Sequence, residues 1–240
     1  MLAFDAVGRI VASFLFLGCG DDNATPVDAS PERSPDIVLD ATPDTDNCRR
    51  LWAVTDAAAG QTATVEGGAL RFVAATLAPG AASIQVTQEA SIAGDFDATF
   101  DVTVFAPGSI GAYVQAGVRP PAPATSFGTG GIGTIPSSGI RAAIQGGGGP
   151  SDIADTTATA ATIRFQRTGD MLTVTTTAAD ATVATVMGGL SGNLSIGIEL
   201  GNNHPTDATT SETSAEIASF TITQGGGAAM ADTFDCDSLL

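Results

Sequence analysis

The 240-residue chain contains no lysine, one histidine, one tryptophan and one tyrosine. All nine of its basic residues are arginines, against 26 acidic residues, so the formal net charge is −17. No cluster of basic residues could neutralise a row of phosphates, which argues against nucleic acid as a partner. The single histidine, His204, stands among turn-forming residues, where a place in a surface loop is favoured over general-base catalysis.

Long apolar runs are also missing. The uncharged stretch at residues 10–18 is much shorter than the roughly 20 residues that a membrane-spanning helix needs. It follows Arg9 and ends in small residues, which is the outline of a secretory signal peptide that is later removed. The sequence therefore predicts a signal peptide over residues 1–18.

The last three residues of the signal peptide and the residue after it read Phe16-Leu17-Gly18-Cys19, which resembles the lipobox of bacterial lipoproteins. The resemblance implies cleavage before Cys19 and a lipid on its sulfur. It also implies that the protein is anchored in a bacterial cell envelope, at the outer membrane or cell surface, with the membrane as a partner. The alternative is an ordinary cleaved signal with an incidental cysteine.

Residues 19–47 predict a disordered tether behind this cysteine. Eight acidic residues, one arginine and spaced prolines leave few sizeable apolar side chains to form a core. Such a composition does not offset the conformational entropy lost on folding, and the prolines keep the chain extended. A lipid-anchored protein needs such a segment to clear the membrane.

The other two cysteines are Cys48 and Cys236, which lie at the two ends of the remaining chain. In an oxidising compartment we expect them to form a disulfide that closes nearly the whole domain into a loop. A metal site is the competing interpretation. It fails because two distant cysteines and one histidine do not make a tetrahedral ligand set.

Residues 48–240 predict one all-β domain. In residues 96–104 the apolar side chains alternate with aspartate and threonine at period two, which is typical of a strand with one buried face. Turn residues separate many such segments, and no long helical pattern competes with them. The expected architecture is a two-sheet antiparallel jelly-roll sandwich, with further strands at 69–74, 83–89, 112–119, 139–145, 161–167, 171–177, 193–200 and 216–223.

Several of these segments resemble the concanavalin A-like lectin/glucanase jelly rolls, which include laminin-G-like domains. The matching segments are Gly94-Asp95-Phe96 at the start of a long strand, residues 113–118, the strand and turn at 163–170, and residues 215–222. The resemblance spans residues 66–223. It implies this fold, and carbohydrate as the class of ligand.

No catalytic residue is predicted. The glucanases of this fold carry Glu-x-Asp-x-x-Glu on one strand, and that pattern does not occur here. Asp97 and Asp101 would stand about 13 Å apart on a strand, too far for either glycosidase geometry. We therefore expect no enzyme activity. A degenerate or atypical glycoside hydrolase is the alternative.

Binding residues are predicted on three successive strands, where the alternation places polar side chains on the outward face of each strand. They are Tyr113, Gln115, Arg141, Gln145, Arg164 and Gln166. If those strands are neighbours, the six side chains form one polar patch suited to hydroxyl-rich or carboxylate ligands. The alternative is an ordinary solvated face. The leading hypothesis is a non-catalytic binding or adhesion module for a polysaccharide or glycan, and a structural envelope protein is a third interpretation.

Two glycine-containing segments, residues 119–139 and 146–158, are predicted as long flexible loops. They could gate the patch, or hold Ca²⁺ through Asp152 and Asp155, or have no role. Apart from Ca²⁺, no cofactor is expected.

Overall fold

The computed structural model describes residues 52–57, 60–88, 91–121, 127–134, 138–145, 151–232 and 234. They belong to a compact unit that runs from Asp44 to Leu240. The proposed signal peptide, the tether and the three cysteines (Cys19, Cys48 and Cys236) lie outside the described residues. Lipidation and the disulfide therefore stay predictions.

The described residues form fifteen strands and no helix, which confirms the all-β prediction. None of them forms a helix that could cross a membrane. The strands are β1 (Trp52–Ala57), β2 (Gln61–Glu66), β3 (Ala69–Ala74), β4 (Ala81–Gln88), β5 (Phe96–Ala106), β6 (Ala112–Arg119), β7 (Phe127–Thr134), β8 (Ser138–Gln145), β9 (Ser151–Asp155), β10 (Ala161–Thr168), β11 (Met171–Thr177), β12 (Thr182–Met187), β13 (Ser195–Asn202), β14 (Thr213–Gln224) and β15 (Met230–Asp232).

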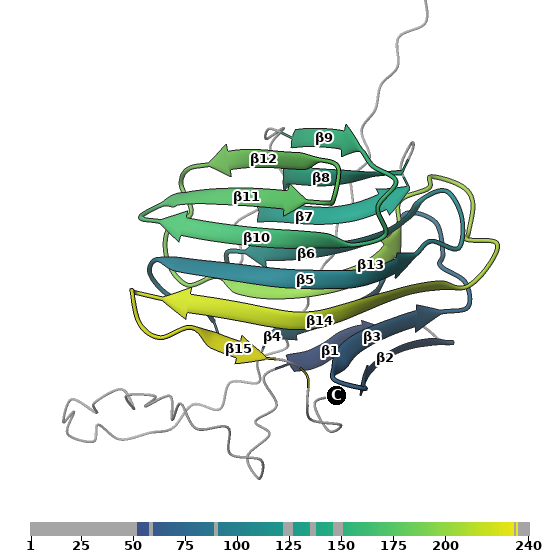
Figure 1. Ribbon diagram of the computed structural model, residues 1–240, viewed down its shortest axis with the longest axis horizontal. Helices are drawn as coiled ribbons and strands as arrows, with labels where there is room; N and C mark the ends of the chain where they lie inside the picture. Colours follow the sequence, from purple (N-terminus) through teal and green to yellow (C-terminus); the bar gives the residue numbers. More distant parts are fainter. Residues whose placement is uncertain are drawn as a thin grey trace, which may run out of the picture. The chain divides into compact units, whose positions relative to one another are not determined.

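The strands build two antiparallel sheets that pack face to face. The seven-stranded sheet has the order β1-β4-β13-β6-β7-β8-β9, and the eight-stranded sheet has the order β12-β11-β10-β5-β14-β3-β2 with β15 beside β14. Figure 1 shows β12, β11, β10, β5 and β14 in front, with β8, β7, β6 and β13 in the layer behind them. This arrangement is the predicted jelly-roll sandwich.

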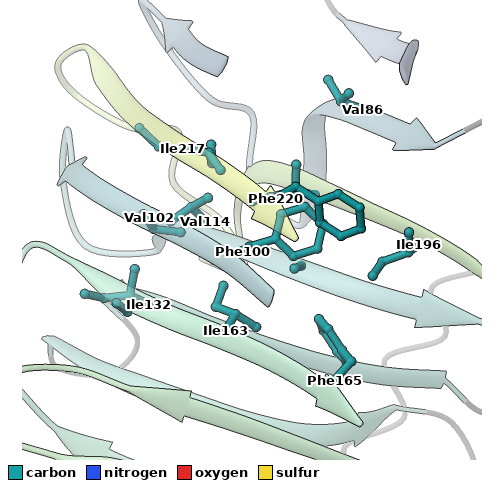
Figure 2. Close-up of a cluster of buried hydrophobic side chains, with 14 of the residues drawn as sticks. Val86, Phe100, Val102, Val114, Ile132, Ile163, Phe165, Ile196, Ile217 and Phe220 are labelled. Atoms are coloured by element: carbon teal, nitrogen blue, oxygen red, sulfur yellow. The ribbon is translucent and has the colours of Figure 1, made fainter. Parts of the chain in front are cut away.

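The core fills the space between the sheets, because one face of almost every strand is apolar. Along β10 burial alternates strictly, with Ile163 and Phe165 buried and Arg164 and Gln166 exposed. Figure 2 shows Val114, Ile132 and Ile196 of the seven-stranded sheet among Phe100, Phe165 and Phe220 of the other sheet. Such close packing of large apolar side chains is the main favourable contribution to folding.

The single tryptophan, Trp52, is part of this core and is only 2% exposed. Its ring meets Phe220 edge-on at 5.0 Å and lies 6.3 Å from Phe234. Its indole Nε1 donates a hydrogen bond to Asp232 at 2.8 Å. This contact joins the first and last described strands.

Part of each segment predicted to be a flexible loop is a strand instead. Residues 127–134 form β7 and residues 151–155 form β9. The loop prediction for residues 127–134 was wrong because glycine lacks the side chain that would reveal a strand's alternation. The loop prediction for residues 151–155 was wrong because this short strand is mostly exposed and shows no buried apolar face.

Candidate functional site

The outer face of the seven-stranded sheet carries a row of aligned residues, four of which are polar. Antiparallel partners point to the same face, and the strand register aligns one residue from each of six neighbouring strands. Their neighbours Val114, Ile140 and Ile198 point inward to the core, so the row faces outward. In strand order the row is Gln85, Glu199, Gln115, Gly131, Arg141 and Ile153.

A second row, one step along the strands, is Gly201, Tyr113, Gly133, Gly139 and Asp155. Gly131, Gly133 and Gly139 thus leave a side-chain-free floor on β7 and β8. A Cβ on Gly131 would lie 2.5 Å from the carbonyl oxygen of Val114, so no other residue fits there without moving β6. The glycines create a hollow beside the polar row.

This hollow, which we call the β7 pocket, encloses about 320 Å³. Tyr113 and Gln115 line its β6 side, and Arg141 and Ile153 line its β8 and β9 side. The residues that line it are Tyr113, Val114, Gln115, Thr129, Gly130, Gly131, Ile132, Gly133, Gly139, Ile140, Arg141, Ile153 and Asn203. No carboxylate is among these lining residues.

Glu199 lies next to the pocket and is only 6% exposed. Its carboxylate accepts hydrogen bonds from Gln115 Nε2 at 2.6 Å, Gln85 Nε2 at 3.2 Å and the Tyr113 hydroxyl at 3.3 Å. Arg119 Nη2 adds an ion pair at 3.5 Å. These donors offset the cost of burying a charge, and in return the carboxylate fixes the Tyr113 and Gln115 side chains.

Tyr113 lies on the outer face of the sheet but is buried, with 7% of its surface exposed. Burial raises the pKa of its phenol well above the ordinary value, and the neighbouring Glu199 carboxylate raises it further. The hydroxyl is therefore protonated and remains a donor to Glu199 at any physiological pH.

Arg141 is half-buried at the opposite side of the pocket. Its Nε is fully buried and has no hydrogen-bond partner among the described residues. Burial lowers the pKa of its guanidinium, although an arginine stays charged in proteins. Thr129, 1% exposed, also lines the pocket, and its Oγ1 likewise has no partner in the described part of the chain.

The structure brings together three of the six residues predicted from sequence, Tyr113, Gln115 and Arg141, in the β7 pocket. The six-residue patch itself is wrong, because β8 and β10 belong to different sheets. Arg164 and Gln166 lie on the outer face of the eight-stranded sheet, where Arg164 forms a bidentate ion pair with Asp97. Gln145 is the last residue of β8, and its side chain lies outside the described part of the structure.

Asp152 and Asp155 were candidates for a Ca²⁺ site. Both lie on β9, three residues apart, so their side chains point to opposite faces of the strand. Asp152 accepts a hydrogen bond from the backbone of Ala184 in the other sheet at 3.3 Å. Among the described residues no group of three histidine, cysteine, aspartate or glutamate side chains could hold a metal ion. The two aspartates do not converge on one ion.

Sequence reasoning missed Glu199, Thr129, Ile153 and Asn203. Glu199 did carry a signal, because it is an acidic residue inside the strand that alternates as Ile196, Ile198 and Leu200, with glycines in its own phase. Its burial on the outer face depends on side chains from β4 and β6, which the local sequence does not reveal. Thr129 was hidden in the glycine run that had been assigned to a loop.

The order and packing of the two sheets define a concanavalin A-like jelly roll, the fold of lectins and glucanases. Comparison by sequence finds no matching protein family and no similar curated protein. Solved structures share the fold at low sequence identity. One is a functionally unknown protein from Saccharomyces cerevisiae, with a TM-score of 0.54 and 10% identity, covering 74% of this chain and 98% of that one.

Two further similar structures have names that refer to carbohydrate binding or cleavage. A legume lectin-like domain from Entamoeba histolytica has a TM-score of 0.51 and 8% identity, covering 74% of this chain and 91% of that one. SCLam, a non-specific endo-β-1,3(4)-glucanase of family GH16, has a TM-score of 0.50 and 9% identity, covering 70% of this chain and 82% of that one. At such low identity these similarities establish the fold alone.

Proposed function

We propose that this protein is a non-catalytic carbohydrate-binding module of a bacterial cell envelope, anchored through a lipid on Cys19, and that the β7 pocket is its binding site. The fold supports this proposal, since similar structures include a lectin-like domain and a glucanase. The motif at residues 16–19 and the acidic segment that follows it support the anchor.

The observation that carries the proposal is the lining of the pocket. Gln115, Arg141 and Asn203 offer donors and acceptors from different strands and loops around a floor of glycine. Thr129 lies at the floor with a buried hydroxyl that has no partner among the described residues, and Ile153 and the ring of Tyr113 offer apolar surface. A hollow with a few fixed polar groups and apolar walls suits a ligand such as a sugar, which presents hydroxyls on its edges and C–H groups on its faces.

Glycoside hydrolysis is the competing function and fits less well. Most glycosidases place two carboxyl groups about 5–9.5 Å apart on either side of the scissile bond. The lining residues include no carboxylate. The nearby Glu199 is engaged by Gln85, Tyr113, Gln115 and Arg119, which suits a positioning residue better than a nucleophile or acid.

The proposal is tested with the full chain, in mild detergent, against a panel of neutral and acidic polysaccharides in affinity electrophoresis. The pocket variant combines Thr129→Val with Asn203→Ala, which removes two polar groups without disturbing Glu199. The matched control is Thr162→Val, an exposed threonine on the outer face of the other sheet.

We expect micromolar to millimolar binding to at least one polymer, weakened about tenfold by the pocket variant and unchanged by the control. Folded protein that binds no polysaccharide contradicts the proposal, and so does binding that the pocket variant leaves intact. Release of reducing ends from a bound polymer would favour the hydrolase instead.

A further inference from the structure

Arg141 differs from every other arginine that the structure describes. Arg71 pairs with Glu66 and Glu216, Arg119 with Glu199, Arg164 with Asp97, and Arg167 donates to the carbonyl of Gly192. The guanidinium of Arg141 has no side-chain or backbone partner in the described residues, and its Nε is fully buried. A half-buried cation without a partner is costly to keep, since burial disfavours charge.

Among the described residues, no fixed counter-charge lies beside Arg141. Its nearest row neighbours are Gly131 on one side and Ile153 on the other. Asp155 on β9 pairs with Gly139, one step along the strands, but forms no ion pair with Arg141 and has another partner. Glu199 is three strands away along the row, about 14 Å at ordinary strand spacing, and is held by its own donors.

The pocket therefore presents an unpaired positive charge on one side only. At its β6 side the donors Tyr113 and Gln115 are turned toward Glu199 and fixed there. At its β8 side the unpaired cation of Arg141 lines the cavity, which Thr129 of β7 lines as well. Between them lies the glycine floor, which carries no side chain that would separate a bound ring from the guanidinium.

We infer that the β7 pocket takes an anionic sugar unit, whose carboxylate or sulfate group pairs with Arg141. This inference rests on the proposed function and names the class of its ligand. The planar guanidinium matches such oxyanions with two parallel hydrogen bonds, which are among the strongest that side chains make. A neutral sugar would leave the half-buried cation without a counter-charge.

The net charge of the chain gives the inference a distinct salt dependence. At −17 the protein repels polyanions at long range, so general electrostatic attraction does not account for binding an acidic polymer. Only a local contact would hold such a ligand. Raising the salt concentration from about 0.02 M to about 0.15 M should then leave the affinity unchanged or increase it, because salt screens the long-range repulsion more than the half-buried contact.

The test compares three polymers with the full chain in detergent. They are a polyuronate, the same polymer with its carboxyl groups reduced to alcohols, and a neutral-backbone polymer carrying sulfate esters. The variants are Arg141→Gln and Arg141→Lys, with Arg164→Gln as the matched control on the opposite face. Trp52 fluorescence verifies that each variant is folded.

We expect the polyuronate or the sulfated polymer to bind at least about tenfold more tightly than the carboxyl-reduced polymer. Arg141→Gln should remove that preference, Arg141→Lys should retain part of it, and Arg164→Gln should leave it intact. Binding of the polyuronate identifies the anionic group as a carboxylate, and binding of the sulfated polymer identifies it as a sulfate.

Four results overturn the inference. If neutral and acidic polymers bind equally and the pocket variant weakens both, the proposed function holds and the anionic specificity is wrong. If an acidic polymer binds but Arg141→Gln has no effect, or if added salt weakens binding steeply, the contact lies elsewhere. If nothing binds, the proposed function fails as well.

Discussion

At the scale of single residues, Glu199 organises the outer face of the seven-stranded sheet. A buried carboxylate without partners would be strongly destabilising, yet here four side chains from β4 and β6 donate to it. One of them, Arg119, also covers the ring of Phe127 at 4.6 Å, which connects the network to β7. Glu199 thereby determines where Tyr113 and Gln115 stand at the pocket.

Tyr113 offers a direct test of this network. Burial and the Glu199 charge raise the pKa of its phenol, so the stabilisation it contributes is fully present below the ordinary value of about 10 and is lost as the pH rises above it. The chain has no lysine and only this tyrosine, so few other side chains titrate in that range. Native protein should show no tyrosinate absorbance near pH 10–11, and the signal should appear only as the protein unfolds.

The control is the same titration in concentrated urea, where Tyr113 should ionise near its ordinary pKa of about 10. The variant Tyr113→Phe lacks the ionisable group. Its free energy of unfolding, measured by Trp52 fluorescence, should therefore not show the decrease above about pH 10 that ionisation of Tyr113 causes. A tyrosinate signal at pH 10 with native Trp52 emission would show that the phenol is neither buried nor bonded to Glu199.

For residues of the site, the sequence predicted only which face of the sheet each side chain points to, because alternation along a strand shows that and no more. Tyr113, Gln115 and Arg141 stand on the outer face in the predicted phase, because their neighbours Val114 and Ile140 are apolar and buried. The burial of Tyr113 was not predictable. It depends on Glu199, which lies 86 residues further along the chain.

At the scale of the element, β7 shows how alternating glycines serve two faces of one strand. Gly131 and Gly133 face outward and form the floor of the pocket. Gly128 and Gly130 face inward, where a Cβ would lie 2.6 Å from Leu172 and 2.7 Å from Ile163 of the opposite sheet. The strand therefore lets the other sheet approach closely at the place where the outer face is hollow.

Gly130→Ala should destabilise the protein by about 1–3 kcal/mol, since the new methyl group meets Ile163 and Thr176, whose branched side chains have little room to move. Gly117→Ala, on the neighbouring β6, is the matched control. A Cβ there makes only ordinary contacts at 3.6 Å, so we expect no loss and a gain of up to about 1 kcal/mol. Urea unfolding followed by Trp52 fluorescence measures both, and equal stabilities would show that the sheets are less tightly packed at β7.

Most strands were predictable because their apolar and polar residues alternate. The predicted segments 69–74, 112–119 and 171–177 coincide with β3, β6 and β11. β7 was missed because four of its eight residues are glycine, which carries no hydropathy pattern. β9 is five residues long and mostly exposed, so its sequence resembles a loop.

At the scale of the whole chain, the pairing of strands decided which predicted residues form a site. Strands consecutive in sequence often pair, and β6, β7, β8 and β9 do so. After β9 the chain crosses to the other sheet and continues as β10, which separates Arg164 from Arg141. Nothing in the local sequence of residues 156–160 indicates this crossing, because both sheets need the same alternation.

The lipid anchor is a prediction for the whole molecule, made from residues 16–19. Wild-type protein expressed in a bacterium should sediment with membranes, whereas Cys19→Ser should appear in the soluble fraction with unchanged Trp52 emission. Wild-type protein recovered without detergent, with an unmodified Cys19 by mass spectrometry, would disprove the anchor.

Anchoring also matters for binding, since a single small pocket gives modest affinity. Many copies on one membrane should hold a repeating polymer about 10²-fold or more tighter than the released variant does. Comparing both forms on the same polymer measures that gain, and equal affinities would mean that the anchored copies do not act together.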